Sequence, residues 1–224
     1  MTYRCEFCQR EFQRETSIAV HMCEQKRRRF ERDEPGVRIG FQAYLRFYET
    51  QQGTARLKTH DDFCESAYYR AFVKFGRYCV ATQVINPSRF MDWLLKNQKK
   101  IDNWCSDNLY TEYLQWYLPA EAVDDALARA MEYSMTWSET NGHPANHCLR
   151  YGNTNKICYE ITTGRISPWV IYNSESGQKF LSECSSEQLA MIWPYINSDV
   201  WQKKFHDYTA DQAYVTDILK KAGW

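Results

Sequence analysis

The sequence predicts a mainly α-helical fold in which a small ββα segment at the N-terminus is joined to a helical body. Apolar residues recur every third or fourth position over 61–82 and 120–138, which is the period of an amphipathic helix. Aromatic residues make up 16% of the chain, with 8 Trp and 16 Tyr, which is more than a disordered chain carries. The body should therefore fold around a core of its own.

The chain of 224 residues is long for one domain but short for two large ones, which favours a small N-terminal segment and one body. We predict a ββα segment with a basic tail in residues 1–29 and a helical body in residues 40–224. Residues 30–39 are a predicted linker, because charges and Pro35-Gly36 interrupt both periods. The predicted helices of the body are 42–48, a long helix capped by Asp61 or Asp62 and running to about 82, 90–94, 120–138, and three C-terminal helices from 186, 199 and 211.

One region of the body allows two interpretations. Segments 157–161 and 166–172, separated by a turn with Gly164, could form a β-hairpin. They could equally be helices, because Gly164 suits a helix C-terminus and Ser167-Pro168 is a cap followed by proline in the first turn. We favour helices, since the neighbouring segments are predicted to be helical and a lone hairpin needs something to cover it.

The first residues of the chain carry the spacing of a metal site. Cys5 and Cys8 are separated by two residues, so both thiolates can reach one Zn2+. The twelve residues between Cys8 and His21 leave room for a strand return and the start of a helix. We therefore predict that Cys5, Cys8 and His21 bind Zn2+. A segment that has lost its metal is the alternative.

The fourth ligand is predicted to be Cys23. Only Met22 separates it from His21, and residues two apart on an α-helix point about 200° apart. Both side chains can share one metal only if the helix ends or tightens right after His21. His60 and Cys64, which lie outside the segment, are weaker candidates for the fourth position.

The segment resembles the C2H2 zinc-finger family, in a variant with the ligand order Cys-Cys-His-Cys. Tyr3, Phe12 and Ile18 lie where such a finger places its three-residue core, which is too small to hold the fold without metal. The sequence departs from the family between the last two ligands, where three to five residues are usual. By resemblance, the helix positions that such fingers turn toward base edges fall on Arg14, Thr16, Ser17 and Val20.

A basic run follows the segment directly. Lys26, Arg27, Arg28 and Arg29 could neutralise nucleic-acid phosphates whatever the base sequence, with salt-dependent affinity. Residues 1–29 contain seven Lys or Arg and four Asp or Glu, so this part has a charge of +3 and the remainder −3. We predict that nucleic acid, DNA rather than RNA, binds here, with Arg14, Thr16 and Ser17 as the other contacts. A solvated linker or a localisation signal is the alternative for the run.

The body offers no known catalytic motif, and its catalytic residues stay unknown. Residues 143–148 place two His and one Cys close together, a spacing that fits no familiar metal motif. Three acidic pairs could bind Mg2+ in a nuclease, but helix caps and solvated faces explain them more simply: Asp61 and Asp62, Asp124 and Asp125, Glu132 and Glu139. Trp104, Trp116 and Trp137 could stack on bases, although core packing is commoner for such residues.

The body, with the stretch 165–170 (Arg-Ile-Ser-Pro-Trp-Val), also resembles uncharacterised proteins of T4-like tailed phages. That resemblance implies a phage protein that acts in the host cytoplasm. Nine Cys, an odd number, and the lack of an apolar run of about 18 residues favour a reducing cytoplasm and no membrane contact.

The sequence therefore predicts an accessory or adaptor protein whose zinc finger binds DNA while its helical body holds a replication, recombination or transcription protein. One alternative is an enzyme, either a DNA-directed nuclease or a nucleotide-modifying enzyme, that the finger tethers to its substrate. The other is a zinc finger used only for binding protein.

Overall fold

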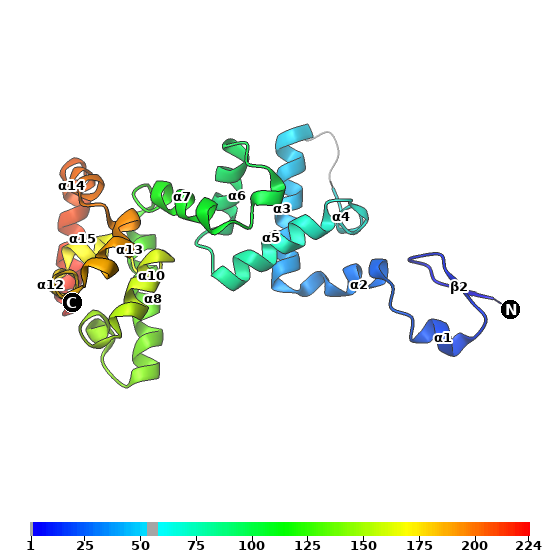
Figure 1. Ribbon diagram of the computed structural model, residues 1–224, viewed down its shortest axis with the longest axis horizontal. Helices are drawn as coiled ribbons and strands as arrows, with labels where there is room; N and C mark the ends of the chain where they lie inside the picture. Colours follow the sequence, from blue (N-terminus) through cyan, green and yellow to red (C-terminus); the bar gives the residue numbers. More distant parts are fainter. Residues whose placement is uncertain (1, 53–57) are drawn as a thin grey trace. The chain divides into compact units, whose positions relative to one another are not determined.

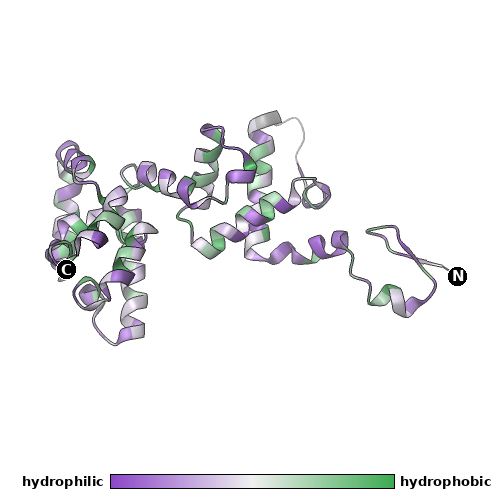
Figure 2. Cartoon of the chain, viewed as in Figure 1, coloured by the Kyte–Doolittle hydropathy of each residue, from purple (hydrophilic) through white to green (hydrophobic). Residues whose placement is uncertain are grey.

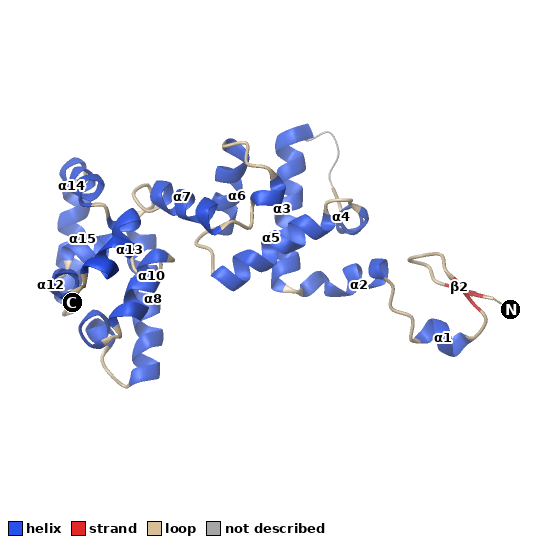
Figure 3. Cartoon of the chain, viewed as in Figure 1, coloured by secondary structure: helices blue, strands red, loops and turns tan. Residues whose placement is uncertain are grey.

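The computed structural model describes residues 2–52 and 58–224, and this part of the chain is mainly helical (Figures 1 and 3). Its one sheet is a two-stranded hairpin near the N-terminus, followed by a short helix. The predicted fold class, mainly α with a small ββα segment, is confirmed. The chain divides into two compact units, which we call unit 1 (residues 1–106) and unit 2 (residues 107–224).

Unit 1 contains the hairpin and the first helices. Its elements are β1 (Tyr3–Arg4), β2 (Glu11–Phe12), α1 (Glu15–Ala19), α2 (Glu24–Phe30), the 3-10 helix η1 (Glu31–Asp33), α3 (Pro35–Gln52), α4 (His60–Glu65), α5 (Tyr69–Thr82), α6 (Pro87–Lys96) and η2 (Ile101–Asn103). Large aromatic side chains without solvent exposure form the core around α3 and α5: Phe63, Phe72, Phe75, Phe90 and Trp104.

Helices α3 and α5 cross with their backbones in contact. A methyl group added at Gly76 would collide with the carbonyl oxygen of Gly36 and lie 2.7 Å from the nitrogen of Gly40. One added at Gly40 would lie 2.7 Å from the carbonyl oxygen of Phe72. The crossing therefore requires residues without a side chain, because any Cβ would force the helices apart.

Two secondary-structure predictions for unit 1 were wrong. Residues 30–39 do not form an irregular linker, because η1 and the first turns of α3 occupy them, and Pro35 starts α3 as proline can at a first helical position. The long helix predicted from Asp61 or Asp62 is two helices, separated at Ser66, which has an extended backbone. Its cap is Thr59, which accepts a hydrogen bond from the Asp62 backbone while the Asp62 carboxylate accepts one from the Thr59 backbone.

Unit 2 is entirely helical. Its elements are α7 (Asp107–Tyr117), α8 (Val123–Asn141), the 3-10 helix η3 (Ala145–His147), α9 (Cys148–Tyr151), α10 (Thr154–Thr162), α11 (Pro168–Asn173), α12 (Glu175–Glu183), α13 (Ser186–Ile196), α14 (Ser198–Asp207) and α15 (Thr209–Lys221). The β-hairpin considered near 157–172 is absent from this unit. Asn153 and Ser167 cap α10 and α11, and Gly164 takes the left-handed conformation between them, so the favoured helical interpretation is correct.

A buried ion pair fixes the turn after α10. Both nitrogens at the end of Arg129 donate to the carboxylate of Glu121 at 2.7 Å, and its Nε donates to the carbonyl oxygen of Gly164 at 2.8 Å. Burial raises the pKa of Glu121, while its bonds to Arg129 act against that rise.

In the described residues no helix is long and apolar enough to cross a membrane.

Candidate metal centre

The loop between β1 and β2 places Cys5 and Cys8 on a tight knuckle. The strands pair antiparallel, and the Cys5 amide donates to the carbonyl oxygen of Arg10 at 2.9 Å. The chain then reverses through Gln9, which has a left-handed backbone and whose amide donates to the Cys5 carbonyl oxygen at 2.8 Å. This turn brings both sulfur atoms to one side of the hairpin, as the two-residue spacing predicts.

The other two side chains of the cluster come from the connection between α1 and α2. Helix α1 ends at Ala19, so neither His21 nor Cys23 is inside it. Cys23 has an extended backbone and is the N-cap of α2. The 200° separation of two side chains on a continuous helix therefore does not arise. The helix does end early, as the shared metal would require, but it ends before His21 and not right after it.

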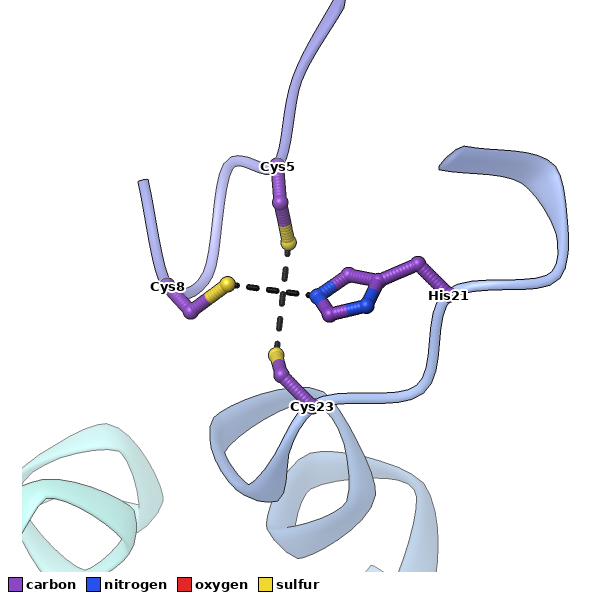
Figure 4. A group of neighbouring side chains, drawn as sticks. All are labelled: Cys5, Cys8, His21 and Cys23. Carbon is purple, nitrogen blue, oxygen red and sulfur yellow. Dashed lines mark hydrogen bonds between the residues drawn. The ribbon is translucent and has the colours of Figure 1, made fainter. Parts of the chain in front are cut away.

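Figure 4 shows the four side chains pointing toward a common centre. Their ligand atoms all lie within 4.8 Å of one another. The Cys5 and Cys23 sulfurs are 4.0 Å apart, and the Cys8 sulfur is 3.2 Å from Nε2 of His21. Sulfurs bound tetrahedrally at about 2.3 Å from a zinc ion would be roughly 3.8 Å apart, so the cluster has the size of a four-coordinate metal site.

The chemistry of the four groups also fits a cation. The backbone N–H of Cys8 lowers the pKa of the Cys5 thiol. At Cys8 the N–H of Arg10 has the same effect, but desolvation and the neighbouring sulfurs outweigh it and raise the pKa of that thiol. Three thiolates this close repel one another unless a metal ion shares them. The site can therefore hold a metal ion through Cys5, Cys8, His21 and Cys23.

Apolar residues support the histidine. The Phe12 ring lies 4.7 Å from the His21 ring, and Tyr3 pairs with Phe12 across the hairpin. Together with Ile18 these side chains are only half-buried, in line with the three-residue core predicted from the sequence. Packing this small orients the imidazole but buries little surface, so it contributes little to the stability of the segment.

His60 and Cys64 are not part of the cluster. The Cys64 sulfur lies 3.5 Å from Nδ1 of His60 in α4, and the thiol is fully buried. Burial raises the pKa of Cys64 and lowers the pKa of His60, so each group is held in its neutral form. Of the candidates for the fourth ligand, the structure thus brings only Cys23 to the other three.

The predicted base-reading side chains lie on the surface of α1 and its ends. Arg14 precedes α1, Thr16 and Ser17 are in its first turns, and Val20 follows it. All four are exposed. The side chains of Arg14, Thr16 and Ser17 make no hydrogen bond or ion pair with the described residues, which leaves their polar groups available to a ligand.

The basic run forms α2, which Figure 2 shows as largely hydrophilic, but two of its side chains are engaged inside unit 1. The guanidinium of Arg28 lies 4.4 Å from the Tyr69 ring centre and donates to the carbonyl oxygen of Cys64 at 2.7 Å. Arg29 pairs with Asp61 at 3.0 Å and with Glu65 at 3.1 Å. The Arg28 side chain is only 12% exposed. These residues hold α2 against α4 and α5.

The first half of the run is more open. Arg27 is exposed and forms ion pairs with residues close to it in the chain, Glu24 and Glu31. The Lys26 amide donates to the Cys23 sulfur at 3.4 Å, and its ammonium group donates to the His21 carbonyl oxygen at 3.4 Å. Sequence reasoning could not find these partners, and the assignment of the run to phosphate contacts stays a prediction.

The remaining candidates do not form a second site. In residues 2–52 and 58–224, no other group of three His, Cys, Asp or Glu side chains comes within metal-binding distance. In the 143–148 segment, His143 stacks on Trp137 and Cys148 is buried beside Ser134. Asp61 pairs with Arg29, and Asp124 accepts a hydrogen bond from Tyr214 at 3.0 Å. Trp104 and Trp137 are core residues, whereas Trp116 is 45% exposed.

Comparison with known proteins matched no protein-family model, no curated protein and no solved structure. The resemblance to C2H2 fingers thus rests on the motif and on the geometry of the four ligands, and the resemblance to tailed-phage proteins gains no support.

Proposed function

We propose that this protein binds zinc through Cys5, Cys8, His21 and Cys23, and binds nucleic acid, DNA in preference to RNA, through the exposed face of α1. The observation that carries the proposal is the combination of a closed four-ligand cluster with an adjacent polar surface that has no partner in the described part of the chain. The cluster would fix the short helix, and the helix would present the surface.

The ligand set favours zinc in a structural role. Thiolates are soft ligands, and three of them with one imidazole are a common set for tetrahedral zinc. Four protein ligands leave no open position for water or substrate, in contrast to catalytic zinc sites. The chemistry that such an ion supplies is therefore cross-linking: it ties the hairpin knuckle to the start of α2.

Purified, reduced protein should contain one zinc ion per chain. Elemental analysis of chelator-free protein measures this content, and cobalt substitution should give the intense charge-transfer absorption of thiolate ligands. Cys5→Ser and Cys23→Ser should each weaken metal retention, whereas the matched variant Cys64→Ser should not. Well under one zinc per chain in the unmodified protein would show that the cluster is not a zinc site.

Nucleic acid is the proposed ligand because of the chemistry of the α1 surface. A guanidinium such as that of Arg14 can donate two parallel hydrogen bonds to the O6 and N7 atoms of guanine. The hydroxyls of Thr16 and Ser17 can donate or accept at base edges. One finger reads only about three base pairs, so further contacts to the phosphate backbone are needed for useful affinity.

Arg14→Ala should weaken binding selectively. We expect a loss of about 1–3 kcal/mol on the preferred sequence and little change on unrelated sequences, because only base-edge contacts carry sequence information. The measurement is fluorescence anisotropy on duplexes taken from a binding-site selection, with RNA as competitor. Arg38→Ala changes an exposed arginine of α3 and serves as the matched control.

Two results would count against the proposal. An equal loss on all sequences would assign Arg14 to phosphate and leave the finger without base recognition. Failure of the unmodified protein to bind DNA or RNA would reject nucleic-acid binding altogether and favour a finger that binds protein.

The protein partner expected for the helical residues, and with it the adaptor role in replication, recombination or transcription, stays a prediction.

A further inference from the structure

The boundary between the two units separates opposite charges. Unit 1 contains 19 Lys and Arg and 13 Asp and Glu, which gives a net charge of +6. Unit 2 contains 9 Lys and Arg and 15 Asp and Glu, a net charge of −6. Residues 1–29 account for only +3 of the charge of unit 1, so the other half of its excess lies in residues 30–106. The neutral total therefore hides a strongly basic unit.

Helix α5 presents part of that charge to solvent. It contains no acidic residue over its 14 residues. Arg70, Lys74 and Arg77 are four and three residues apart, so they lie on one face of the helix and span about 10 Å along it. All three are exposed. Figure 2 shows hydrophilic and hydrophobic stretches alternating along this helix.

Two of these three cations are available to a ligand. Arg77 is held by Glu34 and Glu31. The Arg70 side chain is 80% exposed and reaches Glu24 only at 3.7 Å, an interaction that contributes little in water. Lys74 has no ion-pair partner in the described residues. This contrasts with Arg28 and Arg29 of the basic run, which are engaged by α4 and α5.

We propose that Arg70 and Lys74 on the exposed face of α5 form a second, sequence-independent contact that binds the phosphate backbone of nucleic acid. The inference rests on the proposed function, and it supplies the phosphate contacts that a single finger needs. Charge complementarity carries it: the surface belongs to the basic unit, carries no carboxylate of its own helix, and offers cations at the spacing of one helical turn.

An anionic membrane surface fits this face less well. A helix that binds in a membrane interface needs large apolar side chains that can enter the bilayer beside its cations. The large aromatic side chains Phe72 and Phe75 of α5 are buried in unit 1, whereas Val80 is 43% exposed. The exposed apolar side chains at this end of the helix, Val80 and Ala81, are small and offer little apolar surface to a bilayer.

The test is the salt dependence of binding to a labelled DNA duplex of arbitrary sequence, measured with the full-length protein. The double variant Arg70→Gln, Lys74→Gln should lower the slope of log affinity against log salt by about 1.8, since each phosphate contact contributes about 0.9. Between about 50 and 200 mM salt, that change makes the loss of affinity roughly tenfold smaller than for the unmodified protein. Thermal melting should be unchanged, because both side chains are exposed.

The matched control is Lys203→Gln, Lys220→Gln, which removes the same charge from exposed positions of unit 2. It should leave the slope unchanged. An equal change of slope in both double variants would show that only the net charge of the protein matters, and would overturn the proposal. An unchanged slope in the α5 variant would overturn it too. Binding of the unmodified protein to anionic lipid vesicles but not to the duplex would also overturn it. If the unmodified protein binds DNA and only Arg14→Ala reduces that binding, the proposed function stands and this inference alone is wrong.

Discussion

Removal of the metal should unfold residues 3–23 and also loosen α2 from α4 and α5, while unit 2 keeps its own unfolding transition. The expected effect is large, because structural zinc contributes about 10–16 kcal/mol to small zinc modules at neutral pH. The half-buried Tyr3, Phe12 and Ile18 cannot replace that contribution. Hydrogen–deuterium exchange resolves the effect along the chain: amides of α2 and α4 should lose protection in chelator, and those of unit 2 should not.

The coupling passes through Cys23, which has two roles. It belongs to the metal cluster, and its sulfur accepts the Lys26 amide as the N-cap of α2. A metal-bound thiolate places negative charge at the start of α2, which stabilises a helix. The same helix then holds Arg28 on Tyr69 and Arg29 on Asp61. Loss of the metal frees the Cys23 side chain that caps the first turn of α2. The contacts of Arg28 and Arg29 in its last turn then weaken as well.

Substitutions at this position separate the two roles. Serine is a good N-cap but a poor zinc ligand, so Cys23→Ser should lose the metal and keep the cap. Cys23→Ala loses both the metal and the cap, and should destabilise α2 further by the roughly 1 kcal/mol that a cap contributes. Cys5→Ser, which removes a ligand that belongs neither to α2 nor to its cap, is the control for metal loss alone. Unchanged exchange in α2 and α4 after chelation would show that the site and the helices are independent, and melting of unit 2 in the same step would show that the chain folds as one body.

The cluster of Cys5, Cys8, His21 and Cys23 could be predicted from the sequence because its spacing is a covalent constraint. Two residues between Cys5 and Cys8 permit only a few geometries, and the single residue between His21 and Cys23 requires the helix to end early. Both inferences need only local chain geometry. The same holds for α10 and α11, whose caps Asn153 and Ser167 are local signals.

The fate of the basic run could not be predicted, because it depends on partners far along the chain. Arg29 pairs with Asp61 and Glu65, which lie 32 and 36 positions away, and nothing in the run itself indicates them. The basic nature of unit 1 was hidden for a related reason. A boundary after residue 29 gives charges of only +3 and −3, and the division after residue 106 comes from tertiary contacts.

The structural role of the glycines in α3 could not be predicted from the sequence. Pro35-Gly36 has the appearance of a helix-breaking pair, and breakers usually mark loops. Here Gly36 and Gly40 are inside α3, where they let the backbone of α5 approach at Gly76. A glycine placed for close helix packing and a glycine placed for a turn look the same in one sequence, since only the opposing helix distinguishes them.

Gly76→Ala should therefore destabilise unit 1 strongly. Alanine favours a helix over glycine by about 1 kcal/mol, so an isolated α5 would gain from the change. In the protein the new methyl group would collide with the Gly36 carbonyl oxygen and lie 2.7 Å from the Gly40 nitrogen, both of which are backbone atoms of α3 that cannot rotate away. Overpacking typically costs about 1–3 kcal/mol, and a collision between backbone atoms exceeds that range because a whole helix must move. After subtraction of the gain in helix propensity we expect a net loss of about 2 kcal/mol or more.

Chemical denaturation with a probe in each unit measures that loss, which should appear in unit 1 and spare unit 2. Gly142→Ala is the matched control: its added methyl group has nothing within 4 Å, but the residue has a φ of +70°. It should cost only the backbone penalty of about 1–2 kcal/mol, and in unit 2. A loss below about 1 kcal/mol at Gly76 would mean that α3 and α5 can separate at little cost, and the backbone contact at their crossing would then not be what holds unit 1 together.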